Sequence, residues 1–229
     1  MKTIKYVIFF SFLFSCTIIL GQEQIRKQDL SSYTELKAFD GISITLIKAE
    51  ENKAIISGEN INKVAIVNKD GVLKIRMKID KIFSGFRTFI ELYHTEELLI
   101  IDANEDALIS SEDVFVQDVL ELKAQEGGEV NLNCQTEQLL VKSVTGGDIN
   151  TTGFSKNQDI KINTGGSYNG KTFKTEFTTI TVSAGGEAEI YATEYVKANV
   201  KAGGNIKVYG DPKKMDEKKV FGGIIERIN

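Results

Sequence analysis

Residues 139–151 read Leu139-Leu-Val-Lys-Ser-Val-Thr-Gly-Gly-Asp-Ile-Asn-Thr151, and the same pattern recurs on both sides of this stretch. Glycine pairs begin at positions 127, 146, 165, 185, 203 and 222, so each repeat is 18 to 20 residues long. In each unit an alternating apolar and polar segment leads into the glycine pair, and a second one follows it. This alternation is typical of β-strands, and the glycine pair is typical of a tight corner.

A unit of about 19 residues is too small to bury its own apolar face, so neighbouring units must stack and share one core. The sequence therefore predicts an all-β, single-domain parallel β-helix (solenoid) with coils of about 19 residues. The chain contains one proline, as expected if nearly every backbone N–H is needed between coils. The alternative is an antiparallel sandwich, but its Asn-Gly or Asp-Gly turns are rare; Asp40-Gly41 and Asp70-Gly71 near the start are examples.

Aligning the units on the glycine pair separates inward from outward positions. Three apolar columns are expected to form the core: Val130, Ile149, Tyr168, Ala188 and Ile206; Leu122, Val141, Ile160, Ile180 and Ala198; and Ala124, Ser143, Ile162, Val182 and Val200.

Three further columns are polar and are expected to face outward: Glu129, Asp148, Ser167, Glu187 and Asn205; Asn131, Asn150, Asn169, Glu189 and Lys207; and Lys123, Lys142, Lys161, Thr181 and Asn199. Carboxylates and amides in such a ladder suit a carbohydrate or Ca²⁺, and lysines suit an anionic glycan. The alternative is that the same columns are solvated faces and asparagine ladders that stabilise the stack without a partner.

Near the C-terminal end, Tyr191 and Tyr209 fall at equivalent outward positions one repeat apart. With the surrounding polar residues they form the candidate ligand-binding patch: Tyr191, Tyr209, Glu187, Glu189, Asn205 and Lys207. An aromatic pair can stack on a sugar ring, or it can simply cover the sheet. The expected partner is a carbohydrate or an envelope protein. No catalytic residue, metal ligand or cofactor is assigned.

The composition excludes several kinds of site. The 229 residues carry a formal charge of −4, and a mildly acidic domain is a poor electrostatic match for nucleic acid or anionic lipid. His94 is the one histidine, so no site that needs two histidines is available, and it is expected at the surface. The cysteines are Cys16 and Cys134; if Cys16 lies in a leader, no internal disulfide can form, and Cys134 is expected to be a buried or half-buried small apolar residue.

Residues 1–21 have the composition of a signal peptide, with Lys2 and Lys5 before an apolar run. Cleavage is expected before Gln22, which would export the protein to the periplasm or the cell surface. One alternative is a lipid attached to Cys16. A membrane anchor is a weaker alternative, because the apolar run is short. No later segment is long enough to span a membrane. Residues 22–34 are expected to be flexible and residues 35–229 to form the domain, with an aromatic loop at residues 82–87.

Several segments together carry a resemblance to a known family: Phe39-Asp-Gly-Ile-Ser-Ile44, Ala54-Ile-Ile-Ser-Gly-Glu-Asn60, the glycine-pair units, Val208-Tyr-Gly-Asp-Pro-Lys213 and Phe221-Gly-Gly-Ile-Ile225. In this order, over residues 35–229, the chain resembles the head GIN domain of bacterial auto-transporter adhesins. The resemblance implies an exported right-handed parallel β-helix, common in Bacteroidetes-type bacteria, that is not an enzyme. Its usual corner is Gly-Ser-Gly, whereas this chain has Gly-Gly.

The resulting prediction is a non-catalytic binding or adhesion module of the cell envelope. A polysaccharide lyase or hydrolase is one alternative, because such enzymes use similar solenoids. They need clustered acids with arginine or lysine, whereas the four arginines here are far apart in the sequence. A self-assembling structural β-helix is the other alternative, and it would need two open ends.

Overall fold

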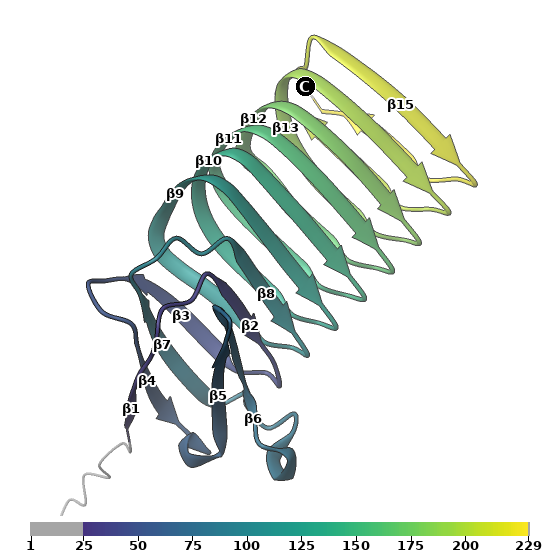
Figure 1. The fold of residues 1–229 in the computed structure, drawn as a ribbon. Coiled ribbons are helices and arrows are strands. Elements are labelled where there is room, and N and C mark those ends of the chain that lie inside the picture. Colours follow the sequence, from purple (N-terminus) through teal and green to yellow (C-terminus); the bar gives the residue numbers. More distant parts are fainter. Residues whose placement is uncertain (1–24, 229) are drawn as a thin grey trace, which may run out of the picture.

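The computed structural model describes residues 25–228, and the expected signal peptide, its cleavage before Gln22 and the lipidation of Cys16 lie outside this range. Of the described residues 70% are in strands, and they form a β-solenoid of about seven turns, with successive coils about 19 residues apart. Figure 1 shows the coils stacked in sequence order towards the C-terminus. The prediction of a parallel β-helix is therefore confirmed, and the sandwich alternative is wrong.

Each long strand of the solenoid covers both legs of one coil and the broad bend between them. Consecutive long strands pair in parallel, with Glu129 opposite Asp148 and Ile160 opposite Ile180. The last coils are divided into shorter strands. The elements are β9 (Leu108–Gln125), β10 (Glu129–Val144), β11 (Asp148–Asn163), β12 (Ser167–Ser183), β13 (Glu187–Lys201), β14 (Asn205–Tyr209), β15 (Lys214–Val220) and β16 (Ile224–Arg227).

The two glycines of a corner have different roles. In the corner between β10 and β11, Gly146 has a φ of +74°, which a residue with a Cβ adopts only under strain. A Cβ on Gly147 would instead lie 2.2 Å from the carbonyl oxygen of Ala124 in the preceding coil. The first glycine thus allows the chain to turn, and the second allows two coils to approach at hydrogen-bonding distance.

At the N-terminal end of the stack, the spatial order of the strands differs from their order in the sequence. The outermost coil consists of β6 and β7, because β6 pairs in parallel with β2 and β7 with β3. The coil of β2 and β3 in turn pairs with β8 and the start of β9. These strands are β2 (Glu35–Ala38), β3 (Ser43–Lys48), β6 (Val72–Met77), β7 (Thr88–His94) and β8 (Ile100–Asn104).

Antiparallel strands extend this outermost coil. The strand β4 (Lys53–Gly58) pairs with β7, and β5 (Val64–Lys69) forms a hairpin with β6 through Asp70-Gly71. Residues 22–34 were expected to be flexible, but this is wrong for residues 26–33. The segment β1 (Arg26–Asp29) pairs with β4, and Tyr33 is buried with its hydroxyl donating to the carbonyl of Tyr93 at 3.1 Å.

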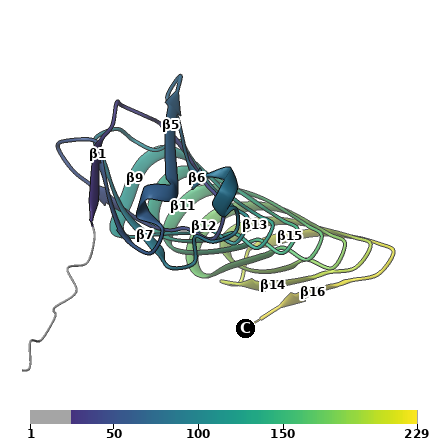
Figure 2. The same cartoon turned by 90° about the horizontal axis from the view of Figure 1, so that it is seen from below.

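One continuous core runs through the stack, and all three predicted inward columns are buried in it. In Figure 2 the coils nest behind one another, with the tight corners on one side and the broad bends opposite.

The buried Tyr168 keeps its hydroxyl hydrogen-bonded, at 2.6 Å from the Thr151 hydroxyl and 2.5 Å from the Gln158 amide nitrogen. Cys134 is buried as predicted, and burial raises the pKa of its thiol to about 12. Between residues 25 and 228, no helix has the length and apolar character of a membrane span.

Candidate functional site

The candidate patch lies on two adjacent parallel strands, β13 and β14. The two strands are in register, so Glu187 lies opposite Asn205, Glu189 opposite Lys207, and Tyr191 opposite Tyr209. Alternate residues of a strand share one face, so all six side chains belong to the same outer surface. The predicted equivalence of Tyr191 and Tyr209 is therefore confirmed.

Four of the six patch residues line a shallow depression of about 250 Å³: Glu187, Glu189, Asn205 and Lys207. The rest of its lining is Ala188, on β13, and Ser167, Tyr168 and Asn169, on β12. Glu189 is the centre of the polar contacts. It accepts hydrogen bonds from the Lys207 ammonium at 3.0 Å and from the Tyr209 hydroxyl at 3.3 Å. The bond to Lys207 lowers the pKa of Glu189 and raises that of Lys207, which favours the charged form of both.

The two tyrosines are both half-buried and differ in what their rings contact. Gly210 packs against the ring of Tyr191, since a Cβ on this glycine would lie 2.6 Å from Cε1 of Tyr191. Tyr209 instead has the ammonium of Lys171 5.0 Å from its ring centroid. The structure thus brings Tyr209 into the polar cluster, and it leaves Tyr191 beside the cluster as a packed residue.

The repeat pattern does not mark Lys171 as a member of this cluster. Lys171 lies in the broad bend of β12, at a register irregularity where β12 and β13 lose their one-to-one pairing between Asn169 and Lys174. The signal in the sequence was the 20-residue spacing between Gly165 and Gly185, one residue longer than the usual repeat. A longer bend was therefore predictable, but the direction of the inserted side chain was not.

Earlier in the stack, the two outward columns that supply the patch residues form side-chain ladders. Asn150 donates to the side-chain oxygen of Asn131 at 2.9 Å, and Ser167 donates to Asp148 at 2.6 Å. These bonds support the interpretation that the columns stabilise the stack. Among residues 25–228, no three His, Cys, Asp or Glu side chains are grouped closely enough to hold a metal ion.

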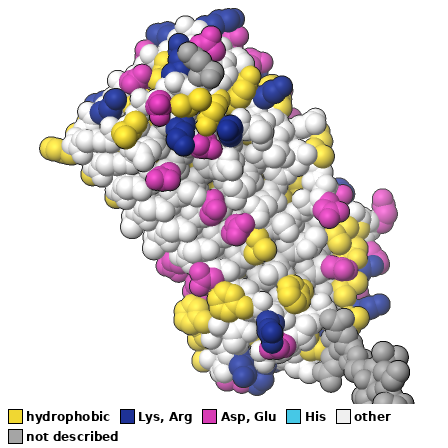
Figure 3. Space-filling model, turned by 180° about the vertical axis from the view of Figure 1, so that it is seen from behind, with side chains coloured by type: hydrophobic (Ala, Val, Ile, Leu, Met, Phe, Trp, Pro, Cys, Tyr) yellow, Lys and Arg dark blue, Asp and Glu magenta, His cyan; other side chains and the backbone are white. Residues whose placement is uncertain are grey.

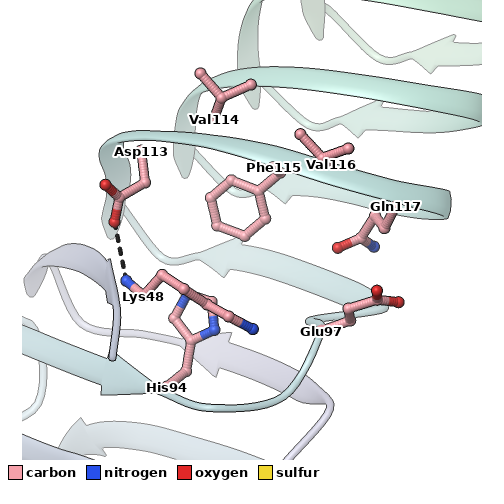
Figure 4. A pocket seen from close by; sticks show the side chains of 8 residues that line it. All are labelled: Lys48, His94, Glu97, Asp113, Val114, Phe115, Val116 and Gln117. Carbon is pink, nitrogen blue, oxygen red and sulfur yellow. Dashed lines mark hydrogen bonds between the residues drawn. The ribbon is translucent and has the colours of Figure 1, made fainter. Parts of the chain in front are cut away.

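A second depression, of about 240 Å³, lies between the end of β7 and the bend of β9 (Figure 4). Its lining residues are Lys48, His94, Glu97, Asp113, Val114, Phe115, Val116 and Gln117. His94 was expected at the surface, and this is wrong: its side chain is buried and stacked on Phe115, with the ring centroids 5.7 Å apart. Its Nδ1 lies 2.9 Å from the carbonyl oxygen of Glu96, so Nδ1 carries the proton of the neutral ring.

This environment makes the stability of the protein depend on pH. Burial lowers the pKa of His94 below its ordinary value of 6.5, and Lys48 acts in the same direction, whereas the Glu96 carbonyl and Asp113 oppose them. The unfolded chain therefore takes up this proton at a higher pH than the folded chain. The free energy of unfolding should be unaffected above pH 7.5 and should fall below about pH 6.5, by at most about 1.4 kcal/mol per pH unit.

Urea midpoints at pH 7.5 and 5.5, compared between the wild type and His94→Gln, measure this effect. Because His94 is the one histidine, the variant should lose most of the difference between the two pH values. An equal loss of stability in both proteins would show that other groups cause it.

The same architecture occurs in several solved structures of bacterial proteins. A "putative adhesin" from Bacteroides fragilis superposes with a TM-score of 0.82 at 19% identity, covering 91% of this chain and 98% of that one. A "putative adhesin" from Parabacteroides merdae gives 0.74 at 16% identity, with 92% and 98% covered. A "putative lipid binding protein" from Parabacteroides distasonis gives 0.70 at 16% identity, with the same coverage. These likenesses show a shared fold.

The sequence itself gives the family. No curated protein matches the chain. Residues 32–212 match the family described as "Putative auto-transporter adhesin, head GIN domain", and this range contains the N-terminal coils, all the long strands and the whole candidate patch. The match covers well over half of the 229 residues, so the chain belongs to this family of adhesin head domains.

Proposed function

We propose that the protein is an exported, non-catalytic binding module of the cell envelope, and that it binds a carbohydrate through the face of β13 and β14. The observation that carries the proposal is the cluster of Glu189, Lys207 and Tyr209 beside an open depression. A carboxylate that accepts and an ammonium that donates can together bind adjacent sugar hydroxyls, and a neighbouring aromatic ring can cover an apolar sugar face.

The charged pair that lines the depression distinguishes this cluster from a similar group elsewhere on the surface. A tyrosine with a hydrogen-bonded acid and a lysine over its ring also occurs at Tyr195, which donates to Asp216 at 2.7 Å and lies 5.5 Å from the ammonium of Lys214. Tyr195 also lines a depression, of about 220 Å³, but Asp216 and Lys214 do not line it. Beside Tyr209, in contrast, both Glu189 and Lys207 line the depression. The proposed site therefore depends on a charged pair that faces a depression as well as on the tyrosine.

Retention on polysaccharides tests the proposal. Purified protein is run by affinity electrophoresis through gels that contain one of a panel of neutral and acidic polysaccharides. Wild type should be retarded by at least one polymer, and Lys207→Ala/Tyr209→Ala should lose most of the retardation, at least about tenfold in affinity, because two direct contacts are removed. Tyr191→Ala should have a smaller effect, since its ring packs against Gly210.

The matched control is Tyr195→Ala, which removes the same kind of side chain from the same kind of group and should leave retardation unchanged. Equal effects of the control and the double variant would contradict the site on β13 and β14. Release of new reducing ends or unsaturated products by wild type, abolished by Glu189→Gln, would instead support the lyase or hydrolase alternative. Binding to an envelope protein without binding to any polymer would replace the carbohydrate with a protein partner.

A further inference from the structure

The corner of the outermost N-terminal coil is an extended, apolar loop, residues 78–87, which we call the terminal loop. Later corners take three residues between strands, whereas this one takes ten and contains the short helical turn η2 (Ile79–Lys81). It exposes large apolar side chains: Ile79 is 79% exposed, Ile82 45%, Phe83 61% and Phe86 59%, and Phe89 just beyond it is 51% exposed. Figure 3 shows hydrophobic side chains gathered at this end of the molecule, with Lys and Arg side chains beside them.

The terminal loop is held in place by the neighbouring coil. The buried carboxylate of Asp40 accepts hydrogen bonds from the backbone N–H of Met77 at 2.9 Å and of Phe83 at 3.1 Å. The carbonyl of Asp40 accepts a third from Gly85 at 2.9 Å. The ring of Phe86 packs over Gly41, about 3.0 Å from the position of a Cβ there. The apolar side chains are therefore exposed by a fixed backbone.

Basic residues surround the apolar surface. Lys63 pairs with Asp80, and Arg87 pairs with Glu59 at 2.7 Å. The remaining lysines, Lys78 and Lys81, have no acidic side chain within salt-bridge distance in the described part of the chain, and Lys78 donates to the Asn62 carbonyl. Lys78 and Lys81 are therefore positive charges beside the apolar side chains that no described acidic side chain pairs, whereas the whole chain has a charge of −4.

The described chain also begins at this end. The strand β1 pairs with β4, and β4 pairs with β7, so that Arg26 lies opposite Ile56 and Ile56 opposite Ile90. The Arg26 guanidinium donates hydrogen bonds to the carbonyl oxygens of Ile61 and Val64. Figure 1 shows the start of β1 and both short helical turns, η1 (Ile61–Lys63) and η2, at the same end of the stack. Ile25, the first described residue, is itself 56% exposed. In the sequence, eight residues separate Ile25 from Cys16.

We propose that the terminal loop is a contact site for the surface of a lipid bilayer. Phenylalanine and isoleucine side chains that protrude from a rigid loop can enter the interfacial region of a membrane, whereas lysine and arginine around them remain in contact with anionic headgroups. A narrow projection with this charge pattern suits a deformable lipid surface better than a flat protein interface. The N-terminus of the domain would then face the membrane, and the C-terminal coils would point away from it.

Vesicle sedimentation of the mature protein tests this inference. The vesicles are phosphatidylcholine alone and phosphatidylcholine with one quarter phosphatidylglycerol, and the test variant is Ile79→Ser/Phe83→Ser, which leaves Phe86 and the Asp40 bonds in place. Wild type should sediment with both vesicles, more strongly with the anionic ones. The variant should lose at least about tenfold in the partition coefficient, because two exposed apolar groups are removed.

Phe221→Ser is the matched control, because Phe221 is 90% exposed and lies in the last glycine corner, away from the terminal loop. It should bind vesicles as wild type does, and thermal melts should show that all three proteins are folded. Wild type that stays in solution with both vesicles would overturn the inference, as would an equal loss in the control. So would a dimer that the double variant dissociates, without vesicle binding, since the loop would then be an interface between two copies. None of these outcomes depends on whether the β13–β14 face binds a polysaccharide.

Discussion

Gly147→Ala is expected to destabilise the protein by about 3 kcal/mol, which for a chain of this size lowers the melting temperature by roughly 6–12 °C. The added Cβ would lie 2.2 Å from the carbonyl oxygen and 2.4 Å from the carbonyl carbon of Ala124. Both atoms belong to the backbone of the adjacent coil, so the contact can be relieved only by separating two coils. Thermal and urea unfolding of the purified variant measure the loss.

The matched control is Gly146→Ala, one residue earlier in the same corner. Nothing lies within 4 Å of a Cβ there, so its cost comes from its φ of +74° and should be about 1–2 kcal/mol. The same chemical change is thus tested for conformational strain at one glycine and for a steric clash at the next. If Gly146→Ala were the more damaging variant, close approach between coils would not be the reason for the second glycine.

Ile180→Asp is expected to destabilise the protein by at least about 4 kcal/mol, sufficient to unfold or aggregate it. Ile180 is fully buried, and its neighbours in the column are Ile160 and Ala198, so an aspartate there has no polar partner in the adjacent coils. Ile149→Asp, in another inward column, should behave in the same way.

The control for Ile180→Asp introduces the same residue one position later, on the outer face. Thr181→Asp lies beside Lys161 in the lysine column and should change the free energy of unfolding by no more than about 0.5 kcal/mol. Circular dichroism and urea titration of the two variants provide the comparison. Similar unfolding curves for both would show that the assignment of inward and outward positions is wrong.

The repeat made the solenoid predictable because every unit meets the same structural requirements. Each coil must place apolar side chains inward, turn at a corner and offer all its backbone groups to the next coil. A single alignment on the glycines therefore assigned the direction of Ile149 and Tyr191 correctly. The register of the candidate patch followed from the same alignment, because the segments that follow consecutive glycine pairs are paired in register.

The parts that were not predicted depend on contacts between segments without the repeat. The pairing of β1 with β4 joins residues that are about 27 positions apart, and no periodicity marks it. His94 is buried because Phe115, from another coil, covers its ring, which a search along the sequence cannot detect. The terminal loop was expected as an aromatic loop, but its place at the end of the stack follows from the spatial order of β6 and β7 before β2 and β3.

The stacking order also makes the length of the molecule countable. Seven strand-to-strand steps lead from β7, beside the terminal loop, to β14 in the candidate patch. At about 4.8 Å per step, these two surfaces are separated by about 34 Å. Inserting or deleting one complete repeat of 19 residues would change this reach by about 4.8 Å and leave the chemistry of either end unaltered. The number of repeated coils therefore sets the distance between the candidate patch and the terminal loop.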